Sequence, residues 1–320
     1  MPERANFPLL PYSYVVGQDE FRLLLAIAYV MGSEGGGVLV SGERGTAKST
    51  IARSFAYMMY DQLPVTLPIN ATDDRIMGGW EINSLLRGDE APEWKNGLLR
   101  MAGDVGMLYI DEVNLLEDHV INLILDVVST GVLTIERDGI GDSDPDVSFM
   151  LVGTMNPDEG PLRPQLLDRF GLFLPIKAER DRDVRREILT RRLKFDVERE
   201  KEYSSWLQVG KQNDLMQRSR LEEAKNRATD IDPSKHPDLL DACAHVAEAF
   251  NVVGHRAELV MARAACAAAA IDGRDVPTPA DVEGIAEYAV RHRRRADDYT
   301  DGFAWDVPEM NLLARVIAEG

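Results

Sequence analysis

The sequence predicts an α/β fold in which a five-stranded parallel sheet is covered by helices and followed by a small all-α domain. Between Gly37 and Ile176, short aliphatic or β-branched runs alternate with helical segments, a pattern typical of parallel sheets built from βα units. From His236 onward the sequence is alanine-rich and has helical character. These two observations divide the chain into a sheet-containing part and a helical part.

Five runs qualify as strands, and they lie at residues 37–41, 64–69, 107–110, 149–153 and 172–175. The runs near residues 108 and 150 are almost wholly apolar. Strands that are covered by helices on both faces show this composition, because neither row of side chains meets water. We therefore expect these two runs to lie inside the sheet.

Two segments interrupt the βα pattern. Residues 71–97 are rich in Gly, Asp and Trp where a plain βα unit would continue as a helix, so they are interpreted as an insertion. Residues 131–147 alternate, turn at Asp138-Gly139 and return into the fourth strand, which indicates a β-hairpin. We expect both insertions to project from one edge of the sheet.

The second half of the chain is predicted to be helical throughout. The pattern divides the protein into a sheet-containing core at 1–178, a charged connector at 179–235 and an all-α domain at 236–320. Helices are expected at 238–250, 256–271 and 279–295, the last with Thr278 as N-cap and Asp281 in its first turn. The basic cluster at residues 291–295 then lies near a helix C-terminus, where cations are favoured.

Composition narrows the class of protein. The chain has 320 residues, 45% of them hydrophobic, so it is long enough for two domains with a substantial core. Its net charge of −18 argues against nonspecific binding to nucleic acid or to an anionic membrane. No apolar run is long enough to cross a bilayer and the N-terminus has no signal-peptide pattern, so a cytoplasmic location is expected. Cys243 and Cys266 are predicted to be small buried residues rather than disulfide or zinc ligands.

The stretch Ser41–Thr50, SGERGTAKST, has the outline of a phosphate-binding loop between a strand and a helix. The amides of such a loop wrap the phosphates of a nucleotide, its lysine contacts the β- and γ-phosphates, and its Ser/Thr binds Mg²⁺. Ala47 stands where the pattern has its second glycine. A negative φ at Ala47 would cost nothing, whereas a positive φ would cost about 1 to 2 kcal/mol through its Cβ. The predicted nucleotide-binding residues in this loop are Gly42, Gly45, Thr46, Ala47, Lys48, Ser49 and Thr50.

Acidic and amide side chains follow the third and fourth predicted strands. The run Gly106–Ile110 ends in Asp111 and Glu112, where a nucleotide-hydrolysing site places one carboxylate for Mg²⁺ and one base for the attacking water. Asp111, with Ser49, is the predicted metal ligand, and Glu112 is the predicted base. Asn156, which ends the fourth strand, is expected to lie beside the γ-phosphate and to hold the water with Glu112.

Two arginines complete the predicted site. Arg169 lies in LLDRFG before the fifth strand, and Arg256 lies in GHRAEL at the start of a helix in the second domain. An arginine beside a transferred phosphoryl group neutralises the developing charge and contributes about 10³ to 10⁵ in rate. Each arginine alone is more often a solvated surface charge, so these two assignments depend on the rest of the site.

The order of GERGTAKS, LYIDE, TMNP, LLDRFG and GHRAEL resembles that of AAA+ ATPases. Longer stretches, among them GLLRMAGDVGMLYIDEVNLLEDHVINLILDVVSTG and VLVGTMNPDEGPLRPQLLDRFGL, are similar to the magnesium chelatase subunit I group over roughly residues 10–295. The resemblance implies an AAA+ P-loop core with a small all-α lid domain. It also implies ATP and Mg²⁺ as cofactors.

The same resemblance implies roles for single residues and for partners. Val16 and Gly17 would line the adenine pocket, Asn156 would be sensor 1, and Arg256 would be sensor 2 from the lid. Arg169 would be the arginine finger that enters a neighbouring subunit, with Arg163 a second contact. The chain would therefore work in a homo-oligomeric ring, commonly a hexamer, with a second AAA+ subunit and a large porphyrin-binding subunit that inserts the metal.

Other functions remain open on the sequence. A MoxR-like ATPase, which acts as a chaperone with a von Willebrand A-domain partner, is the main alternative, because Ala47 is typical of MoxR loops. A helicase is disfavoured by the net charge and by the lack of a basic hairpin with aromatic residues. A scaffold without turnover is disfavoured because Lys48, Asp111 and Glu112 are all present.

Overall fold

The computed structural model describes residues 9–80, 94–137, 140–144, 147–294 and 304–319. Its central sheet has five parallel strands in the order β2-β5-β8-β1-β9. The prediction of a five-stranded parallel sheet is confirmed, with each strand at its predicted place. The strands are β1 (Val38–Ser41), β2 (Val65–Leu67), β5 (Met107–Ile110), β8 (Met150–Met155) and β9 (Leu172–Pro175).

Helices cover both faces of this sheet. Successive side chains of a strand point to opposite faces, so Val38 and Val40 of β1 pack into one apolar cluster and Leu39 packs into the other. The first cluster takes in helices α1 (Asp19–Met31) and α2 (Lys48–Tyr60), and the second takes in α5 (Leu98–Val105) and α6 (Asp118–Thr130). All residues of β1, β5 and β8 are buried, as their apolar composition predicts.

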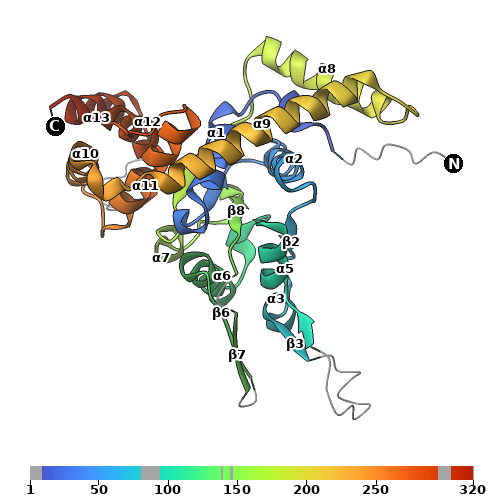
Figure 1. Ribbon diagram of the computed structural model, residues 1–320, viewed down its shortest axis with the longest axis horizontal. Coiled ribbons are helices and arrows are strands. Elements are labelled where there is room, and N and C mark those ends of the chain that lie inside the picture. The colour runs from blue at the N-terminus through green and yellow to red at the C-terminus, as the bar shows by residue number, and fades with distance from the viewer. Residues whose placement is uncertain (1–8, 81–93, 138–139, 145–146, 295–303, 320) are drawn as a thin grey trace.

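The second half is helical, as predicted. Two long helices, α8 (Arg182–Glu198) and α9 (Ser205–Asp230), lead into α10 (Pro237–Ala249), α11 (Arg256–Ile271), α12 (Pro279–Val290) and α13 (Val307–Glu319). Figure 1 shows α9 running from α8 to the lid helices across the top of the sheet domain. Short helices are α7 (Pro164–Leu167) and the 3-10 turns η1 (Tyr12–Tyr14), η2 (Ser33–Gly35), η3 (Val113–Leu115), η4 (Pro157–Glu159), η5 (Pro233–Lys235) and η6 (Arg291–Arg293).

The predicted end of the helix that begins at residue 279 is wrong. The helix expected to reach residue 295 ends at Val290, because Arg291, His292 and Arg293 form the 3-10 turn η6. All three of these residues are buried, although they form a basic cluster near a helix end. The contacts made by His292 and Arg293 are with the sheet domain, which the helical pattern of the lid does not reveal.

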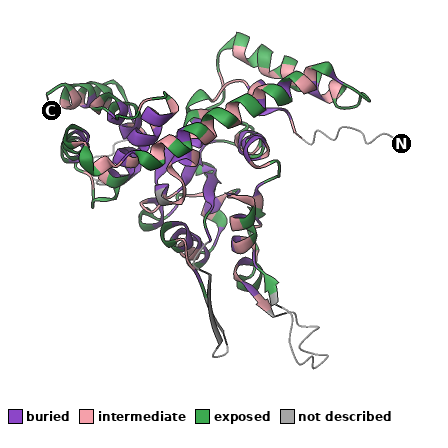
Figure 2. Cartoon of the chain, in the orientation of Figure 1, coloured by how far each residue is buried: buried purple, intermediate pink, exposed green. Residues whose placement is uncertain are grey.

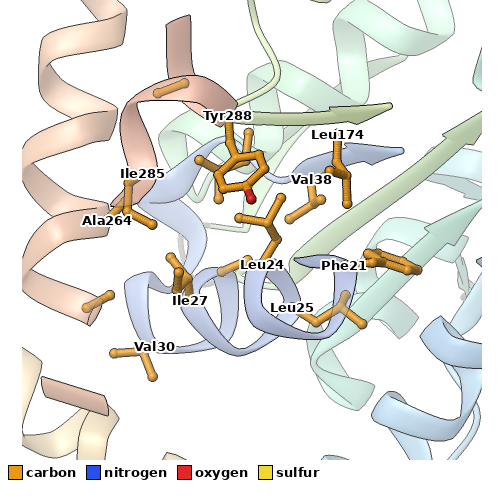
Figure 3. Packing of buried hydrophobic residues seen from close by; sticks show 14 of the residues in the cluster. Phe21, Leu24, Leu25, Ile27, Val30, Val38, Leu174, Ala264, Ile285 and Tyr288 are labelled. Carbon is orange, nitrogen blue, oxygen red and sulfur yellow. The ribbon is translucent and has the colours of Figure 1, made fainter. Parts of the chain in front are cut away.

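The sheet domain and the lid share one apolar core. Figure 3 shows α1 between the two, with Ile27 facing Ala264 and Ile285 of the lid and Phe21 facing the strands. The cluster continues from Val38 and Leu174 of the sheet to the buried faces of α11 and α12. Figure 2 shows the same buried band between lid and sheet, with mostly exposed residues on α8 and on the outer face of α9. The predicted boundaries near residues 178 and 235 stay a prediction.

Both insertions project from the same side of the sheet domain (Figure 1). The first contains α3 (Asp73–Met77) and the antiparallel strands β3 (Gly78–Trp80) and β4 (Trp94–Asn96). The second is the predicted hairpin, in which β6 (Leu133–Arg137) pairs with β7 (Ile140–Asp144). Its predicted turn at Asp138-Gly139 lies outside the described residues.

One smaller prediction concerns the cysteines. Cys243 and Cys266 are both buried, and burial raises the pKa of the Cys243 thiol to about 12 and that of Cys266 to about 11. Among the described residues, no helix combines the length and the apolar character that crossing a bilayer requires.

Candidate functional site

The loop Gly42–Ala47 connects β1 to α2, the place of a phosphate-binding loop in a parallel sheet. Gly42 is needed because a Cβ there would lie 2.6 Å from the carbonyl oxygen of Ile176. Gly45 has a φ of +83°, which favours glycine. The buried Thr46 hydroxyl donates to the carbonyl of Glu43 at 2.8 Å and so closes the loop on itself.

Ala47 adopts the positive φ, which is the costly one of the two cases. Ala47 has φ +66° and ψ +13° and is the N-cap of α2. In this left-handed conformation the Cβ of an alanine costs about 1–2 kcal/mol, a cost that glycine avoids. The loop imposes this angle because the chain must turn sharply between Gly45 and the first turn of α2. Ala47 is exposed, so strain rather than a clash distinguishes it from glycine.

The loop has the donors that a nucleotide triphosphate requires. Within the described residues, the amides of residues 43–47 make no backbone hydrogen bond, so they can bind phosphate oxygens. The Lys48 ammonium donates to the carbonyls of Gly42 and Glu43, the latter at 2.9 Å, which holds it at the mouth of the loop. Burial lowers the pKa of Lys48, and the nearby carboxylates of Asp111 and Glu112 partly oppose that shift.

Asp111 and Glu112 follow β5, next to the strand β8 whose C-terminal end reaches Met155. The hydroxyl of the buried Thr154 donates to Asp111 Oδ1 at 2.6 Å, and the Tyr109 hydroxyl donates to the same oxygen at 3.1 Å. Glu112 has a φ of +57°, an uncommon angle for a non-glycine residue and one that recurs at functional sites. Ser49, in the first turn of α2, and Asp111 have the oxygen atoms that Mg²⁺ prefers.

Sequence reasoning missed Arg44. Its guanidinium pairs with Glu112 Oε1 at 3.2 Å and with Glu159, so it connects the phosphate loop to the predicted base and to η4. The negative charge of Glu159, and after it that of Glu112, raises the pKa of Arg44 above its ordinary value. Sequence reasoning also missed Thr154 as a residue of the site. Its position on β8, two residues before Asn156 in TMNP, could have indicated it.

Asn156 lies directly after β8 and is buried at the same edge of the sheet. Its side chain accepts from the amide of Asp158 at 3.3 Å and so caps η4. Asn156-Pro157 therefore opens a turn, which leaves Asn156 beside Met155, whose carbonyl accepts from the Gly42 amide at 3.1 Å. Asn156 thus neighbours the phosphate loop.

Val16 and Gly17 reach the same edge through contacts with the chain after β9. The amide of Gln18 donates to Glu179 Oε1 at 2.8 Å, and its side chain donates to the carbonyl of Lys177 at 2.7 Å. Gly17 has a φ of +79°, and a Cβ there would lie 2.7 Å from the Glu179 carboxylate. The segment therefore passes close to Ile176, which itself contacts Gly42.

Arg169 and Arg256 lie away from the phosphate loop. They line one pocket of about 340 Å³ together with Gly36, Gly171, Leu125, Ser129, Leu259, Val260 and Arg263. Gly36 precedes β1 and Gly171 precedes β9, and these strands are parallel with Val38 opposite Leu172. The pocket is therefore at the N-terminal edge of the sheet, about 13 Å or more from the phosphate loop at the other end of β1. We call this group the arginine pocket.

Local contacts hold the arginines in the arginine pocket. Arg169 pairs with Asp126 of α6 at 2.9 Å and donates to the Asn122 side chain at 3.1 Å. Arg256 donates to the carbonyl of Asp168 at 3.4 Å. Arg163 is exposed and pairs with Asp118 of α6. The structure thus brings together Lys48, Asp111, Glu112 and Asn156, and it keeps Arg169 and Arg256 apart from them.

Comparisons with known proteins agree with this geometry. Residues 37–170 match the AAA domain of the dynein-related subfamily, and residues 240–309 match the AAA lid domain. The magnesium-chelatase 38 kDa subunit of Cereibacter sphaeroides is 35% identical over 90% of this chain and 92% of its own length. The chain belongs to the magnesium-chelatase I-subunit family of AAA+ ATPases.

Other relatives of this AAA+ ATPase align with most of its chain. The chloroplastic magnesium-chelatase subunit ChlI of Oryza sativa subsp. japonica is 35% identical over 92% of this chain and 78% of its own. An uncharacterised protein of Mycobacterium tuberculosis is 40% identical over 91% of this chain, which spans only 46% of that relative. A solved ATPase structure from Cytophaga hutchinsonii has a TM-score of 0.63 at 18% identity over 96% of this chain and 91% of its own, which supports the fold alone.

Proposed function

We propose that this AAA+ ATPase is the motor subunit of a magnesium chelatase-type complex. In this proposal it hydrolyses ATP within a ring, and the ring drives a partner subunit that inserts the metal into a tetrapyrrole. The names of the relatives that align along nearly the whole chain support the chelatase assignment. One observation supports the ring above all: the phosphate loop and the arginine pocket lie at opposite edges of one sheet.

Residues at the C-terminal edge of the sheet would hold the nucleotide. The amides of Gly45, Thr46, Ala47 and Thr50 and the Lys48 ammonium would bind the phosphates, with Gly42 allowing the turn after β1. Val16 and Gly17 would line the adenine pocket. Ser49 and Asp111 would hold Mg²⁺, which when bound neutralises charge on the β- and γ-phosphates. Thr154 and Tyr109 would fix the Asp111 carboxylate for that task, because both donate to its Oδ1 atom.

Glu112 would act as the general base. Its carboxylate would accept a proton from the attacking water, which Asn156 would help to orient, and this role contributes roughly 10²- to 10⁴-fold in rate. Arg44 occupies Glu112 Oε1 at 3.2 Å, so Glu112 would leave this ion pair before it takes the proton. We expect Glu112→Gln to bind ATP and to hydrolyse it at least about 10²-fold more slowly.

Nucleotide-binding and turnover assays test the role of Glu112. The matched control is Glu117→Gln, which changes an exposed glutamate at the start of α6 and keeps turnover normal. Full activity of Glu112→Gln would refute the assignment.

The arginine pocket would serve the nucleotide of a neighbouring subunit. An arginine at the N-terminal edge cannot reach phosphates bound at the C-terminal edge of its own sheet. Arg169 and Arg256 would therefore act together in trans, with Arg163 at the margin of the same interface. This arrangement requires a ring, and a hexamer is the size that the family resemblance implies.

A subunit-mixing experiment tests this role. Lys48→Ala subunits supply the arginine finger Arg169 but do not hydrolyse ATP. Arg169→Ala subunits have an intact phosphate loop but no arginine finger. Each variant alone should be inactive, and the mixture should regain part of the activity. The control is the mixture of Lys48→Ala with Lys48→Ala Arg169→Ala subunits, which should stay inactive. If no mixture regains activity, Arg169 does not act in trans.

The identity of the partner protein decides which process is driven by ATP hydrolysis. A pull-down with ATP and Mg²⁺ from native cells, analysed by mass spectrometry, should recover a large porphyrin-binding subunit and a second AAA+ or A-domain subunit. Ala47 favours a second candidate, a MoxR-like remodelling ATPase with a von Willebrand A-domain partner. Recovery of an A-domain protein with an unrelated client, and of no porphyrin-binding subunit, would support that candidate and refute chelation.

A further inference from the structure

Two buried lid residues contact the loop that carries Arg169. His292 and Arg293 lie in η6, directly after α12, and both are buried. Their polar atoms contact Asp168, Phe170 and Gly171, which surround Arg169 in the sequence. We call Asp168–Gly171 the finger loop. It lies more than 120 residues before η6, so these contacts join the lid to the sheet domain.

The Arg293 side chain has no exposed surface, and all five of its N–H donors are used. Nε donates to Asp168 Oδ1 at 3.1 Å, and the two other nitrogens donate to the carbonyls of Gly171 at 3.0 Å and of Asp168 at 2.8 Å. The remaining two donors contact the carbonyls of Phe170 and, within α12, Ala289. Four of the five bonds therefore end on the finger loop.

Other contacts hold the finger loop from both sides. From the lid, His292 Nε2 donates to the carbonyl of Phe170 at 3.1 Å, and Arg256 lies 3.8 Å from the Asp168 carboxylate. From the sheet domain, the Gly171 amide donates to the carbonyl of Gly36 at 3.2 Å. A Cβ on Gly171 would lie 1.6 Å from the carbonyl oxygen of Gly35, so only glycine fits at this close approach.

Burial of a guanidinium is costly unless all of its donors are satisfied. Burial lowers the pKa of Arg293 to about 10, with the Asp168 carboxylate opposing that shift, so the side chain is still charged at neutral pH. A methionine or leucine could fill the same volume without this cost. The arginine is therefore better explained by the geometry it imposes on three carbonyls than by packing alone.

We propose that Arg293 is a positioning residue that locks the lid to the finger loop, so that the lid and Arg169 move as one body. A displacement of the lid in one subunit would then move Arg169 relative to the nucleotide of its neighbour. This inference rests on the proposed role of Arg169 in trans. It adds a route by which the state of one site reaches the next site in the ring.

The test places Arg293→Lys separately in each member of the mixing pair. Lysine keeps the charge but has three donors, so it cannot hold the finger loop as arginine does. In the finger donor, Lys48→Ala, the change should lower the regained activity about tenfold or more, because a 1 Å misplacement of a catalytic group costs about 10²-fold. In the site donor, Arg169→Ala, the same change should have little effect.

The matched control is Arg291→Lys in both members. Arg291 is buried in the same turn, and it pairs with Glu287 of α12 inside the lid. Its substitution should cost comparable stability, measured by thermal unfolding, without lowering the regained activity in either member. Equal loss from Arg293→Lys in both members, or loss in neither, would overturn the proposal. If the parent mixture regains nothing, the trans role of Arg169 fails first, and with it this inference.

A second measurement covers the case in which Arg293→Lys does not fold. In the unchanged protein, hydrogen exchange is compared between ADP and a non-hydrolysable ATP analogue. The amides of Arg169 and Gly171 should change protection together with those of α12. A change in the finger loop without a change in α12 would overturn the proposal.

Discussion

Ala47 holds a left-handed backbone angle that strains an alanine and leaves a glycine unstrained. We expect Ala47→Gly to raise the free energy of unfolding by up to about 1 kcal/mol, since relief of strain outweighs the larger entropy of the unfolded chain. Urea denaturation measures this, and ATP hydrolysis should be kept. Gly45→Ala is the matched control. It lies at φ +83° with open space around the added Cβ, so strain alone should lower its stability by a similar amount.

The Thr154 hydroxyl fixes the Asp111 carboxylate with a 2.6 Å hydrogen bond between β8 and β5. We expect Thr154→Val to cost about 1–2 kcal/mol of stability, because a charged acceptor loses its donor. The same change should raise the Mg²⁺ concentration required for half-maximal ATP hydrolysis, which a metal titration measures. Thr66→Val on β2 changes an exposed hydroxyl and should alter neither quantity. An unchanged Mg²⁺ requirement in Thr154→Val would contradict the role given to Thr154.

Single residues differ in how far the sequence could predict them. Lys48, Asp111 and Glu112 follow from motif order, because the carboxyl ends of parallel strands meet at one edge. The φ angle of Ala47 does not follow, since it is set by how the loop joins β1 to α2. Arg44 and Arg293 were missed because their partners lie far away in the sequence, 68 residues in the case of Glu112 and 125 in the case of Asp168.

At the scale of elements, α12 depends on its first turn. Thr278 and Asp281 form a capping box, and Arg274 donates to both Asp281 carboxylate oxygens. Burial acts to raise the pKa of Asp281, but the Arg274 and Thr278 hydrogen bonds outweigh it, and the pKa lies below its ordinary value of 3.8. The stability that this carboxylate contributes is therefore present above about pH 4 and is lost as pH falls through the lower folded-state value.

We expect Asp281→Asn to destabilise the protein by about 1–3 kcal/mol at neutral pH and to have a smaller effect near pH 3. The measurement is thermal unfolding as a function of pH. Glu283→Gln, which changes an exposed carboxylate on the same helix, should match the unchanged protein throughout. A destabilisation by Asp281→Asn that is the same at pH 7 and pH 3 would exclude the carboxylate charge as its cause.

Prediction at this scale was better for strands than for the ends of helices. The five strands could be predicted because each is an apolar run of four to six residues with turn-forming residues at its ends. A run of this kind is shorter than a typical helix. The last lid helix was expected to be too long because Arg291–Arg293 continue a helix-compatible composition. Its true end depends on Phe170 and Asp168, to which His292 and Arg293 donate.

For the whole molecule, one apolar cluster continues from the sheet through α1 into the lid. We therefore expect one cooperative unfolding transition. Trp206, in the first turn of α9, stacks on Tyr14, and Trp305 stacks on Phe250 of the lid, so the two tryptophans report on different parts of the cluster. Variants that keep only one of these tryptophans should show the same urea midpoint. Two separated midpoints would instead support independent folding near the predicted boundary at residue 235.

The opposite placement of the phosphate loop and the arginine pocket also limits the symmetry of any assembly. A contact between the arginine pocket of one copy and the phosphate loop of the next joins two different surfaces, so it is head-to-tail and leaves a free surface of each kind. A two-fold dimer could form this contact only if the arginine pocket and the phosphate loop belonged to one self-complementary face, in which each surface meets the other on the partner copy. If successive copies repeat the head-to-tail contact by a rotation that closes on itself, every copy both supplies an arginine and receives one, so a closed ring leaves no site incomplete.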